Sequence, residues 1–242
     1  MRIPRFYCPE ITEVGEEIKL PLAVHRHAVQ VLRLKSGGGL RLFNGYGLEI
    51  EAVMTSVNKR ESTAKLMTVI QNDIESPLSL TLLQGISRGE RMDYALQKAV
   101  ELGVNKIVPV TTERCNVQLS GPRAQKKVDH WQGVIISASE QSGRCNLPIL
   151  TPIMSFDEVL EKFNSGSRLI LEPTAALGFK TLPLQTETKL LIGPEGGFSD
   201  EEVQTAVRQG FQAVKLGPRT LRTETAAVSA LAILQAMWGD LG

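Results

Sequence analysis

The residues best suited to chemistry lie near the end of the chain, in two loops of glycine, proline and charge. One loop spans residues 193–197 (GPEGG), and the other spans residues 216–225 (LGPRTLRTET). Each follows a short apolar run that predicts a buried strand. Glycine lets a backbone approach a ligand closely, and open α/β sheets bind ligands at the edge where their parallel strands end. We therefore predict that the two loops form one active site.

The charge around the first loop limits the kind of ligand. Ser199 is followed three residues later by Glu202, which is the capping-box pattern of a helix start. A helix N-terminus normally attracts phosphate. Here the acidic residues Glu195, Asp200, Glu201 and Glu202 would repel a polyanion. Neither GxxxxGK[ST] nor GxGxxG occurs in the chain. The site suits a neutral or cationic ligand, and a phosphate-dependent enzyme is disfavoured.

The composition is that of an ordinary globular protein, with 42% hydrophobic and 22% charged residues among 242. The formal net charge of +1 conceals an asymmetry. Residues 1–72 carry ten Lys and Arg against seven Glu, whereas the remainder carries 17 basic against 19 acidic residues. A basic N-terminal part favours nucleic-acid binding, and a solvated basic surface explains the same imbalance equally well.

Cysteine and histidine spacing predicts no metal site. Cys8, Cys115 and Cys145 show no CxxC spacing, so neither a disulfide framework nor a zinc site is expected. His25 and His27 lie two residues apart and point to different faces of a predicted helix. Reduced thiols, the lack of a signal-peptide pattern and the lack of a membrane-length apolar run predict a cytoplasmic protein.

The pattern of predicted elements changes at residues 71–77, a polar stretch that ends in proline and predicts a linker. Before it, short strands separated by turn signals predict a small β-barrel. After it, strands alternate with helices, which predicts a mostly parallel sheet covered on both faces. One helix is expected in the first part, with an apolar face formed by Val24, Ala28, Val31 and Leu32.

The expected strands are residues 40–43, 48–57, 62–70, 78–84, 106–110, 149–150, 168–171, 189–192 and 213–216. The expected helices are residues 92–102, 124–142, 156–163, the segment from Ser199 to near Gly210, and 223–238. The last of these is apolar nearly all round, which is typical of a deeply buried or interfacial helix.

Several segments resemble a known enzyme family. GPEGG after an apolar strand, followed by LGPRTLRTET and an apolar terminal helix, is similar to the end of SPOUT methyltransferases, which bind S-adenosylmethionine in a deep trefoil knot. The closer resemblance is to the bacterial RsmE family, which methylates N3 of a uridine in 16S ribosomal RNA. It extends over the whole chain through MRIPRFYCPE, HAVQVLRLKSGGGLRLFNG, SRGERMDYALQKAVELGVNKIVPV, ERC, ASEQSGR and ILEP. Cys8, at a variable position, and Thr220, where an aliphatic residue is more usual, depart from the pattern.

The resemblance implies an α/β fold with two domains. Residues 1–72 would form a PUA-like RNA-binding β-barrel, and residues 73–242 a SPOUT-type knotted, mostly parallel sheet. It also implies that the partner is 16S ribosomal RNA, with the assembled small subunit as the suggested form. SPOUT proteins are homodimers whose active site the partner completes, so the helix at 223–238 is the interface candidate.

The resemblance further implies which residues hold S-adenosylmethionine, whose sulfonium and ammonium groups agree with the charge of the first loop. Backbone groups would satisfy the adenine edge, and apolar side chains would sandwich its ring. Plain turn chemistry is the alternative explanation for the glycines. The matching residues are Leu171, Glu172, Pro173, Ile192, Gly193, Pro194, Glu195, Gly196, Gly197, Leu216, Gly217, Pro218, Leu221, Arg222 and Thr225.

Methylation at uridine N3 requires removal of the imide proton and stabilisation of negative charge on O2 and O4. Arg222 suits the second task, because its guanidinium stays protonated and can hold an oxyanion, and Arg219 is a second candidate. Glu224 is the candidate proton acceptor, although burial would have to raise its pKa. An acidic residue in the first turn of a helix also stabilises the helix dipole, which is the alternative role for Glu224.

Further residues are predicted to contact RNA. A solvated-surface role explains each basic residue among them as well. The candidates are Arg26, Arg33, Lys35, Arg88, Arg91, Arg114, Glu140, Gln141 and Arg144.

Two other functions compete with this hypothesis. A different SPOUT activity, such as ribose 2′-O methylation, is disfavoured because the resemblance includes the N-terminal part. A ribosome-assembly or RNA-binding factor without catalysis would not need the loops GPEGG and LRTET. Cofactor binding and methyl transfer distinguish these classes.

Overall fold

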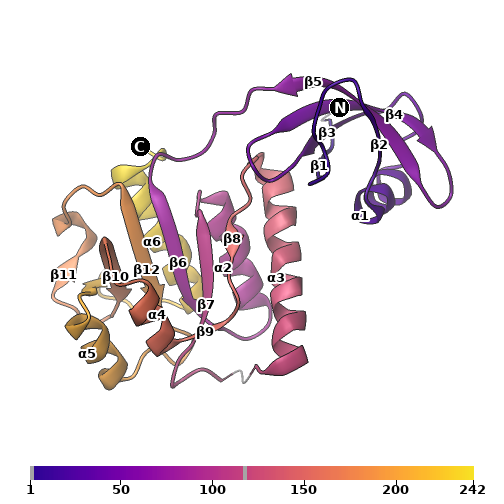
Figure 1. Ribbon diagram of the computed structural model, residues 1–242. Helices are drawn as coiled ribbons and strands as arrows, with labels where there is room; N and C mark the ends of the chain where they lie inside the picture. Colours follow the sequence, from indigo (N-terminus) through magenta and orange to yellow (C-terminus); the bar gives the residue numbers. More distant parts are fainter. Residues whose placement is uncertain (1–2, 117–118) are drawn as a thin grey trace. The chain divides into compact units, whose positions relative to one another are not determined.

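The computed structural model describes residues 3–116 and 119–242, which divide into two compact units (Figure 1). Unit 1 consists of Met1–Glu75 and Ser139–Leu147, and unit 2 consists of Ser76–Ala138 and Pro148–Gly242. A short segment from the middle of the chain therefore packs with the N-terminal unit. No helix among the described residues is both long and apolar enough to cross a membrane.

Unit 1 contains a mixed five-stranded sheet in the order β1-β3-β4-β5-β2. The strands are β1 (Arg5–Tyr7), β2 (Glu17–Lys19), β3 (Gly39–Phe43), β4 (Glu49–Val57) and β5 (Ser62–Ile70). β1 pairs parallel with β3 and the other pairs are antiparallel, so the expected barrel takes the form of a sheet whose edges are β1 and β2. The structure confirms β3, β4 and β5. β1 and β2 are only three residues long, which is too short for an alternating pattern to be recognised.

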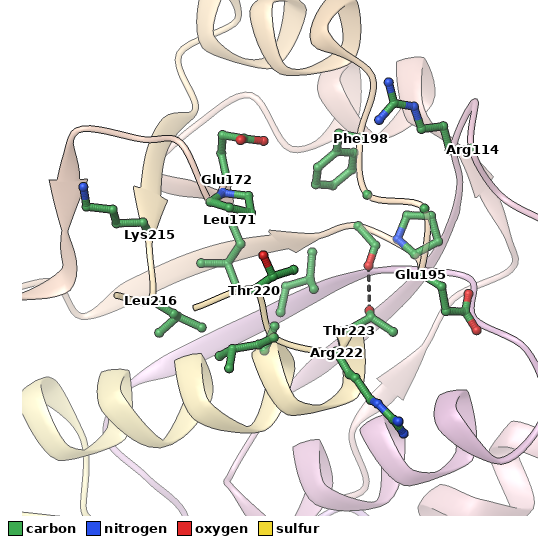
Figure 2. Close-up of a pocket in the computed structure, with 18 of the residues that line it drawn as sticks. Arg114, Leu171, Glu172, Glu195, Phe198, Lys215, Leu216, Thr220, Arg222 and Thr223 are labelled. Carbon is green, nitrogen blue, oxygen red and sulfur yellow. Dashed lines mark hydrogen bonds between the residues drawn. The ribbon is translucent and has the colours of Figure 1, made fainter. Parts of the chain in front are cut away.

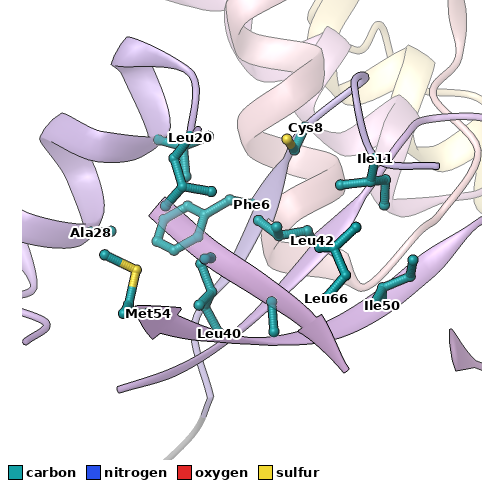
Figure 3. Packing of buried hydrophobic residues seen from close by; sticks show 13 residues of the cluster. Phe6, Cys8, Ile11, Leu20, Ala28, Leu40, Leu42, Ile50, Met54 and Leu66 are labelled. Atoms are coloured by element: carbon teal, nitrogen blue, oxygen red, sulfur yellow. The ribbon is translucent and has the colours of Figure 1, made fainter. Parts of the chain in front are cut away.

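The core of unit 1 forms because alternate residues of the strands face one side of the sheet (Figure 3). In β4, Ile50, Ala52 and Met54 are buried, and they pack with Leu42 of β3 and Leu66 of β5. Fully burying each of the larger side chains contributes about 1.5–3 kcal/mol relative to exposure. All residues of this core belong to unit 1, so the unit is stabilised by the burial of its own side chains.

The predicted helix of unit 1 is present, but its apolar face is smaller than expected. It consists of α1 (Leu22–His25) followed by a π-helical turn, η1 (Arg26–Val31). Val24 and Ala28 are buried, whereas Val31 and Leu32 are 66% and 45% exposed, so the prediction was wrong for these two. The Leu32 N–H donates to a carbonyl five residues earlier. This wider winding rotates the end of the helix away from the face that a regular α-helix would bury.

A buried carboxylate, Glu49, links the segment 139–147 to the sheet of unit 1. It accepts hydrogen bonds from Arg5 Nε (2.8 Å), Asn72 Nδ2 (2.8 Å) and Cys145 Sγ (2.9 Å). Burial by itself would raise the pKa of Glu49, but these hydrogen bonds outweigh it and hold the pKa below its usual value. Burial, followed by the neighbouring Glu49, raises the pKa of the Cys145 thiol to about 12, so the thiol stays protonated and donates.

Arg5 extends the same link to the backbone. Its guanidinium donates to the carbonyl oxygens of Ser139 (2.7 Å) and Arg144 (2.8 Å) and lies 3.8 Å from the centre of the Phe43 ring. Arg144 is itself buried and donates to Glu75 (2.6 Å). The segment is thus held by hydrogen bonds between charged groups that are largely buried.

Unit 2 contains an eight-stranded sheet in which the described pairs are all parallel, in the order β11-β13-β10-β12-β6-β7-β8, with β9 also paired to β7. Its strands are β6 (Ser79–Gly85), β7 (Lys106–Thr111), β8 (Ile149–Leu150), β9 (Met154–Ser155), β10 (Ser167–Leu171), β11 (Leu177–Gly178), β12 (Glu187–Ile192) and β13 (Gln212–Lys215). Its helices are α2 (Glu90–Glu101), α3 (Gly121–Ser142), α4 (Phe156–Lys162), η2 (Phe179–Thr181), α5 (Asp200–Arg208) and α6 (Thr223–Trp238). The predicted alternation of strands and helices is confirmed, apart from the short elements β9, β11 and η2.

Helices cover both faces of this sheet, as the alternating pattern predicts. Figure 1 shows α4 and α5 in front of the sheet and α2 and α6 behind it. The capping box at the start of α5 is confirmed, because Ser199 Oγ accepts from the Glu202 N–H and Glu202 Oε2 accepts from the Ser199 N–H. α6 has the bounds that the sequence predicts. The trefoil knot stays a prediction, since strand order and register describe pairing and not threading.

Replacing Glu49 with alanine should destabilise unit 1 by about 3 kcal/mol, because Arg5 would keep its burial and lose its counter-charge. Amide hydrogen exchange in β4 and β5 measures this loss. Glu51→Ala is the matched control, since the pair Glu51–Arg41 is largely exposed and contributes at most about 1 kcal/mol. Equal protection of β4 in the two variants would contradict the structural role of Glu49.

Candidate active site

A cavity of about 580 Å³ opens at the carboxyl ends of β10, β12 and β13 (Figure 2). Its volume is within the range of small-molecule sites. All but two of the residues predicted to bind the cofactor line it, and the exceptions are Pro218 and Thr225. The structure also brings Phe198, Asp200, Val214, Lys215, Arg219, Thr220, Thr223 and Ala226 to the lining.

The lining segments meet because three parallel strands end at nearly the same level. Ile170 of β10 pairs with Leu191 of β12, and Leu171 pairs with Val214 of β13. The loops that follow must therefore leave the sheet at one edge. This places residues 171–173, 192–197 and 216–222 around one space, although they are distant in sequence.

Two glycines let the first loop pack closely against its neighbours. A Cβ on Gly85, at the end of β6, would lie 2.5 Å from the Pro194 nitrogen, so the backbone of the loop rests directly on that strand end. A Cβ on Gly196 would lie 3.0 Å from the Cβ of Arg114. Packing within the protein thus accounts for these glycines and fixes the position of the loop.

A hydrogen-bonded threonine ties the loop to the terminal helix. Thr223, the first residue of α6, donates through Oγ1 to the Gly193 carbonyl (2.6 Å, dashed in Figure 2). The same oxygen accepts from Gln84 Nε2 (3.1 Å), and Gln84 is fully buried at the end of β6. Sequence reasoning missed both residues. The available signals were a polar residue ending an apolar strand and an unassigned threonine in the LRTET motif.

The acidic residue of the first loop is already engaged by protein groups. Glu195 Oε1 accepts from the Arg88 N–H (2.8 Å) and from Arg91 Nη1 (3.3 Å). Arg91 and Arg114, which were predicted as RNA contacts, lie in the cavity lining, and the Arg88 side chain is exposed outside it. The carboxylate therefore anchors the loop that precedes α2.

Arg222 and Glu224 occupy different environments at the start of α6. Arg222 is exposed, and its guanidinium points away from the group formed by Leu171, Leu216 and Thr220, which places it at the rim of the cavity (Figure 2). Glu224 does not line the cavity. It is half-buried in the first turn of α6, where a negative charge interacts favourably with the helix dipole.

The remaining predicted RNA contacts lie in unit 1. Arg26, Arg33 and Lys35 are exposed, as is Gln141. Glu140 accepts a hydrogen bond from the Tyr7 N–H (3.0 Å), and burial raises its pKa. Arg144 is buried and paired with Glu75. Contacts inside unit 1 thus account for Glu140 and Arg144 without RNA.

The histidines and cysteines have ordinary structural surroundings. His25 Nδ1 lies 3.0 Å from Ser62 Oγ, and the His27 ring packs edge-on against Phe6. The three cysteines are free thiols. Over residues 3–116 and 119–242, no group of three or more His, Cys, Asp or Glu is arranged to hold a metal ion.

Comparison with known proteins identifies the family of the chain. Residues 74–235 match the RNA methyltransferase domain, and residues 25–67 match the RNA methyltransferase PUA domain. The ribosomal RNA small subunit methyltransferase E of Buchnera aphidicola (Schizaphis graminum) is 35% identical over 99% of this chain and 98% of its own length. The chain belongs to the ribosomal RNA small subunit methyltransferase E family. The Bacillus subtilis family member is 27% identical over 93% of this chain and 90% of its own length.

Solved structures of relatives share the fold. A methyltransferase from Legionella pneumophila, solved with the cofactor SAM bound, superposes with a TM-score of 0.97 at 40% identity. The family member from Neisseria gonorrhoeae, bound to S-adenosyl methionine, superposes with a TM-score of 0.93 at 42% identity. Both comparisons cover 100% of each chain. The predicted SPOUT-type sheet with a PUA-like N-terminal part, characteristic of the RsmE family, is confirmed.

Replacing Thr223 with valine should loosen the loop at residues 193–197, because the Gly193 carbonyl loses its donor while the buried Gln84 amide loses an acceptor. We expect amide exchange in this loop to accelerate roughly fivefold to tenfold, the scale of one net hydrogen bond. Thr223→Ser keeps the hydroxyl and should match the wild type. A valine variant with unchanged exchange would show that the hydroxyl does not hold the loop.

Proposed function

We propose that the chain transfers a methyl group from S-adenosylmethionine to N3 of a specific uridine in 16S ribosomal RNA. The observation that carries the proposal is the cavity itself. It is lined by the three loops that the RsmE resemblance assigns to the cofactor, and it lies in a chain that matches members of this family from end to end. The choice of uridine N3 as the methylated atom follows from the known activity of the RsmE family.

The cavity fits the chemistry of S-adenosylmethionine. Leu171, Ile192, Leu216 and Leu221 offer apolar surface for an adenine ring. Among the described residues, the N–H groups of 219–221 donate no hydrogen bond within the protein, so they remain for a polar edge. Glu172 and Asp200 give the lining the acidic groups that a sulfonium and an ammonium favour. When bound, the cofactor would supply the electrophilic methyl group.

We infer that Arg222 acts on the base rather than on the cofactor. A uracil entering from outside must pass the rim of the cavity, where the Arg222 guanidinium lies. Its planar N–H groups can donate to O2 or O4 while negative charge develops there, and the guanidinium stays protonated throughout. Arg219 also lines the cavity and is the second candidate.

The RNA would be gripped by basic residues in both units. Arg91 and Arg114 lie in the lining of the cavity, where they would contact the RNA around the target base. Arg26, Arg33 and Lys35 are exposed in unit 1, where they would contact phosphates and position the RNA without reading its sequence. We infer that the substrate is 16S ribosomal RNA in the assembled small subunit and that the protein works in the cytoplasm, where that subunit is found.

We further propose that the chain acts as a homodimer through α6. Apolar residues lie on several sides of this helix, and Val228, Ile233, Met237 and Trp238 remain partly exposed in the single chain. A helix with more apolar surface than its own unit buries is typical of an interface. The partner would cover this surface and complete the site.

The deciding experiment is methyl transfer from labelled S-adenosylmethionine to small subunits that lack the modification, followed by nucleoside analysis. N3-methyluridine is the expected product. A different methylated nucleoside, such as a 2′-O-methyl nucleoside, would show that the chain uses the cofactor but methylates another atom. Cofactor binding without transfer to subunits or to free RNA would support an assembly factor instead.

Arg222→Ala should lower the turnover rate by roughly a hundredfold or more, the scale of losing an oxyanion donor. Its affinity for S-adenosylmethionine should stay within a few-fold, because the side chain points to the rim. Arg219→Ala is the matched control and should have the smaller effect. Near-normal turnover of the Arg222 variant would remove this residue from the mechanism.

Glu224→Gln separates the two roles of that carboxylate. Because Glu224 lies outside the cavity lining, we expect near-normal turnover and a loss of about 0.3–1 kcal/mol in stability from the helix dipole. Initial rates and thermal unfolding measure the two effects. A rate loss of roughly a hundredfold, the contribution of a general base, would instead establish Glu224 as the proton acceptor.

A further inference from the structure

An exposed tyrosine stands on a well-ordered turn between β3 and β4 of unit 1. Tyr46 is 83% exposed, the largest value among the exposed large apolar side chains of the described residues. Tyr46 directly follows the segment that ends in LFNG, and it lies outside the motifs on which the family resemblance rests. A single exposed apolar side chain is common on protein surfaces. The way in which this turn holds the ring is what distinguishes Tyr46.

The turn at residues 44–48, here called the Tyr46 loop, is braced by hydrogen bonds. Asn44 Oδ1 accepts from the Tyr46 N–H (2.8 Å) and from the Leu48 N–H (3.2 Å), and the Asn44 N–H donates to the Leu48 carbonyl. Gly45 and Gly47 have φ of 85° and 93°, which suits glycine in a tight turn.

The segment 139–147 braces the same loop from its other side. The Leu147 N–H donates to the Gly45 carbonyl (3.0 Å), and the Gly47 N–H donates to the Cys145 carbonyl (3.3 Å). The Tyr46 ring is therefore presented to solvent by a backbone that is already ordered. A ligand that binds it does not have to order the loop, which lowers the entropic cost of binding.

An aromatic ring and an amide lie near Tyr46, beside the partly buried Leu48 and Leu147. A Cβ on Gly45 would lie 3.0 Å from Tyr7 Cε2, so the Tyr7 ring packs against the backbone next to Tyr46. Asn146 forms isolated bridges with Gly45 and Tyr46, and its side-chain amide makes no hydrogen bond within the described residues. Because opposite residues of an antiparallel bridge project to the same side, the Tyr46 ring and the Asn146 amide, which can both donate and accept, are neighbours.

We propose that the Tyr46 ring stacks on an unpaired base of the RNA substrate, with the Asn146 amide beside it to contact the edge of that base. RNA-binding proteins recognise unpaired nucleotides by stacking on aromatic side chains and by hydrogen bonds to base edges. The loop lies within residues 25–67, which match the RNA methyltransferase PUA domain. This inference rests on the proposed RNA substrate and assigns a positioning contact remote in sequence from the cavity-lining loops.

A docking surface for protein is less consistent with the surroundings. Interfaces between proteins bury contiguous apolar patches of several hundred Å². Next to Tyr46, Gly45, Gly47 and Asn146 offer backbone and amide groups, and the apolar side chains beside this turn, Leu48 and Leu147, are only partly exposed. A ring with polar neighbours suits a flat base that also carries hydrogen-bonding groups.

The test compares Tyr46→Ala, Tyr46→Phe and Tyr46→Trp in the full chain, with Val69→Ala as a control for an equally simple change at an exposed position of unit 1. The affinity for protein-free 16S ribosomal RNA is measured by filter binding at several salt concentrations. We expect the alanine variant to raise Kd roughly tenfold. The Phe, Trp and control variants should stay within about twofold, and the salt dependence should be unchanged because stacking releases no counterions.

With small subunits as substrate, the alanine variant should raise KM and leave kcat and cofactor affinity as in the wild type. Unchanged RNA affinity of the alanine variant would overturn the proposal, as would a Phe variant as weak as the alanine variant. An effect seen with whole subunits and absent with protein-free RNA would assign Tyr46 to a protein contact and also overturn it. Wild-type methyl transfer in the same series tests the proposed function separately, because the Kd comparison does not depend on catalysis.

Discussion

The shared level at which β10, β12 and β13 end is the constraint on which the site depends. Parallel strands in register deliver their following loops to one edge of the sheet, whatever their distance in the chain. Here the pairs Ile170–Leu191 and Leu171–Val214 set that level. Gly85 then lets the loop backbone rest on the end of β6. A slip of one residue in any of these strands would move its side chains to the opposite face of the sheet and displace the loop that follows, which would dismantle the cavity.

The electrostatics of the site differ in one respect from the argument based on sequence. The sequence suggests that Glu195 is a free negative charge that repels phosphate. In the structure its carboxylate accepts hydrogen bonds from the Arg88 N–H and from Arg91. Glu195 therefore joins the loop at residues 193–197 to the start of α2 and the loop before it. Glu172 and Asp200 remain as acidic groups in the lining, and basic side chains lie around them. A cationic cofactor and an anionic RNA can thus use neighbouring parts of the same surface.

Unit 1 depends on a different kind of interaction. Its apolar core follows from alternating strands, but the segment 139–147 is held by the buried charges of Arg5 and Glu49 and by the protonated Cys145. Buried charged pairs contribute little net stability and instead penalise wrong arrangements, because an unpaired buried charge is costly. The same segment braces the Tyr46 loop. One buried network therefore supports both the packing of unit 1 and the presentation of an exposed ring.

The sequence by itself determined the elements whose signals are local. Periodicity and capping residues placed α5, α6 and the longer strands, and the loop motifs indicated the family and most of the cavity lining, since such signals depend on neighbours within a few residues. Only the tertiary structure decided the partners of Glu49, the link from Gln84 through Thr223 to Gly193, and the exposure of Val31 and Leu32. These features depend on residues brought together from distant parts of the chain, or on a π-helical turn that a regular helical period does not describe.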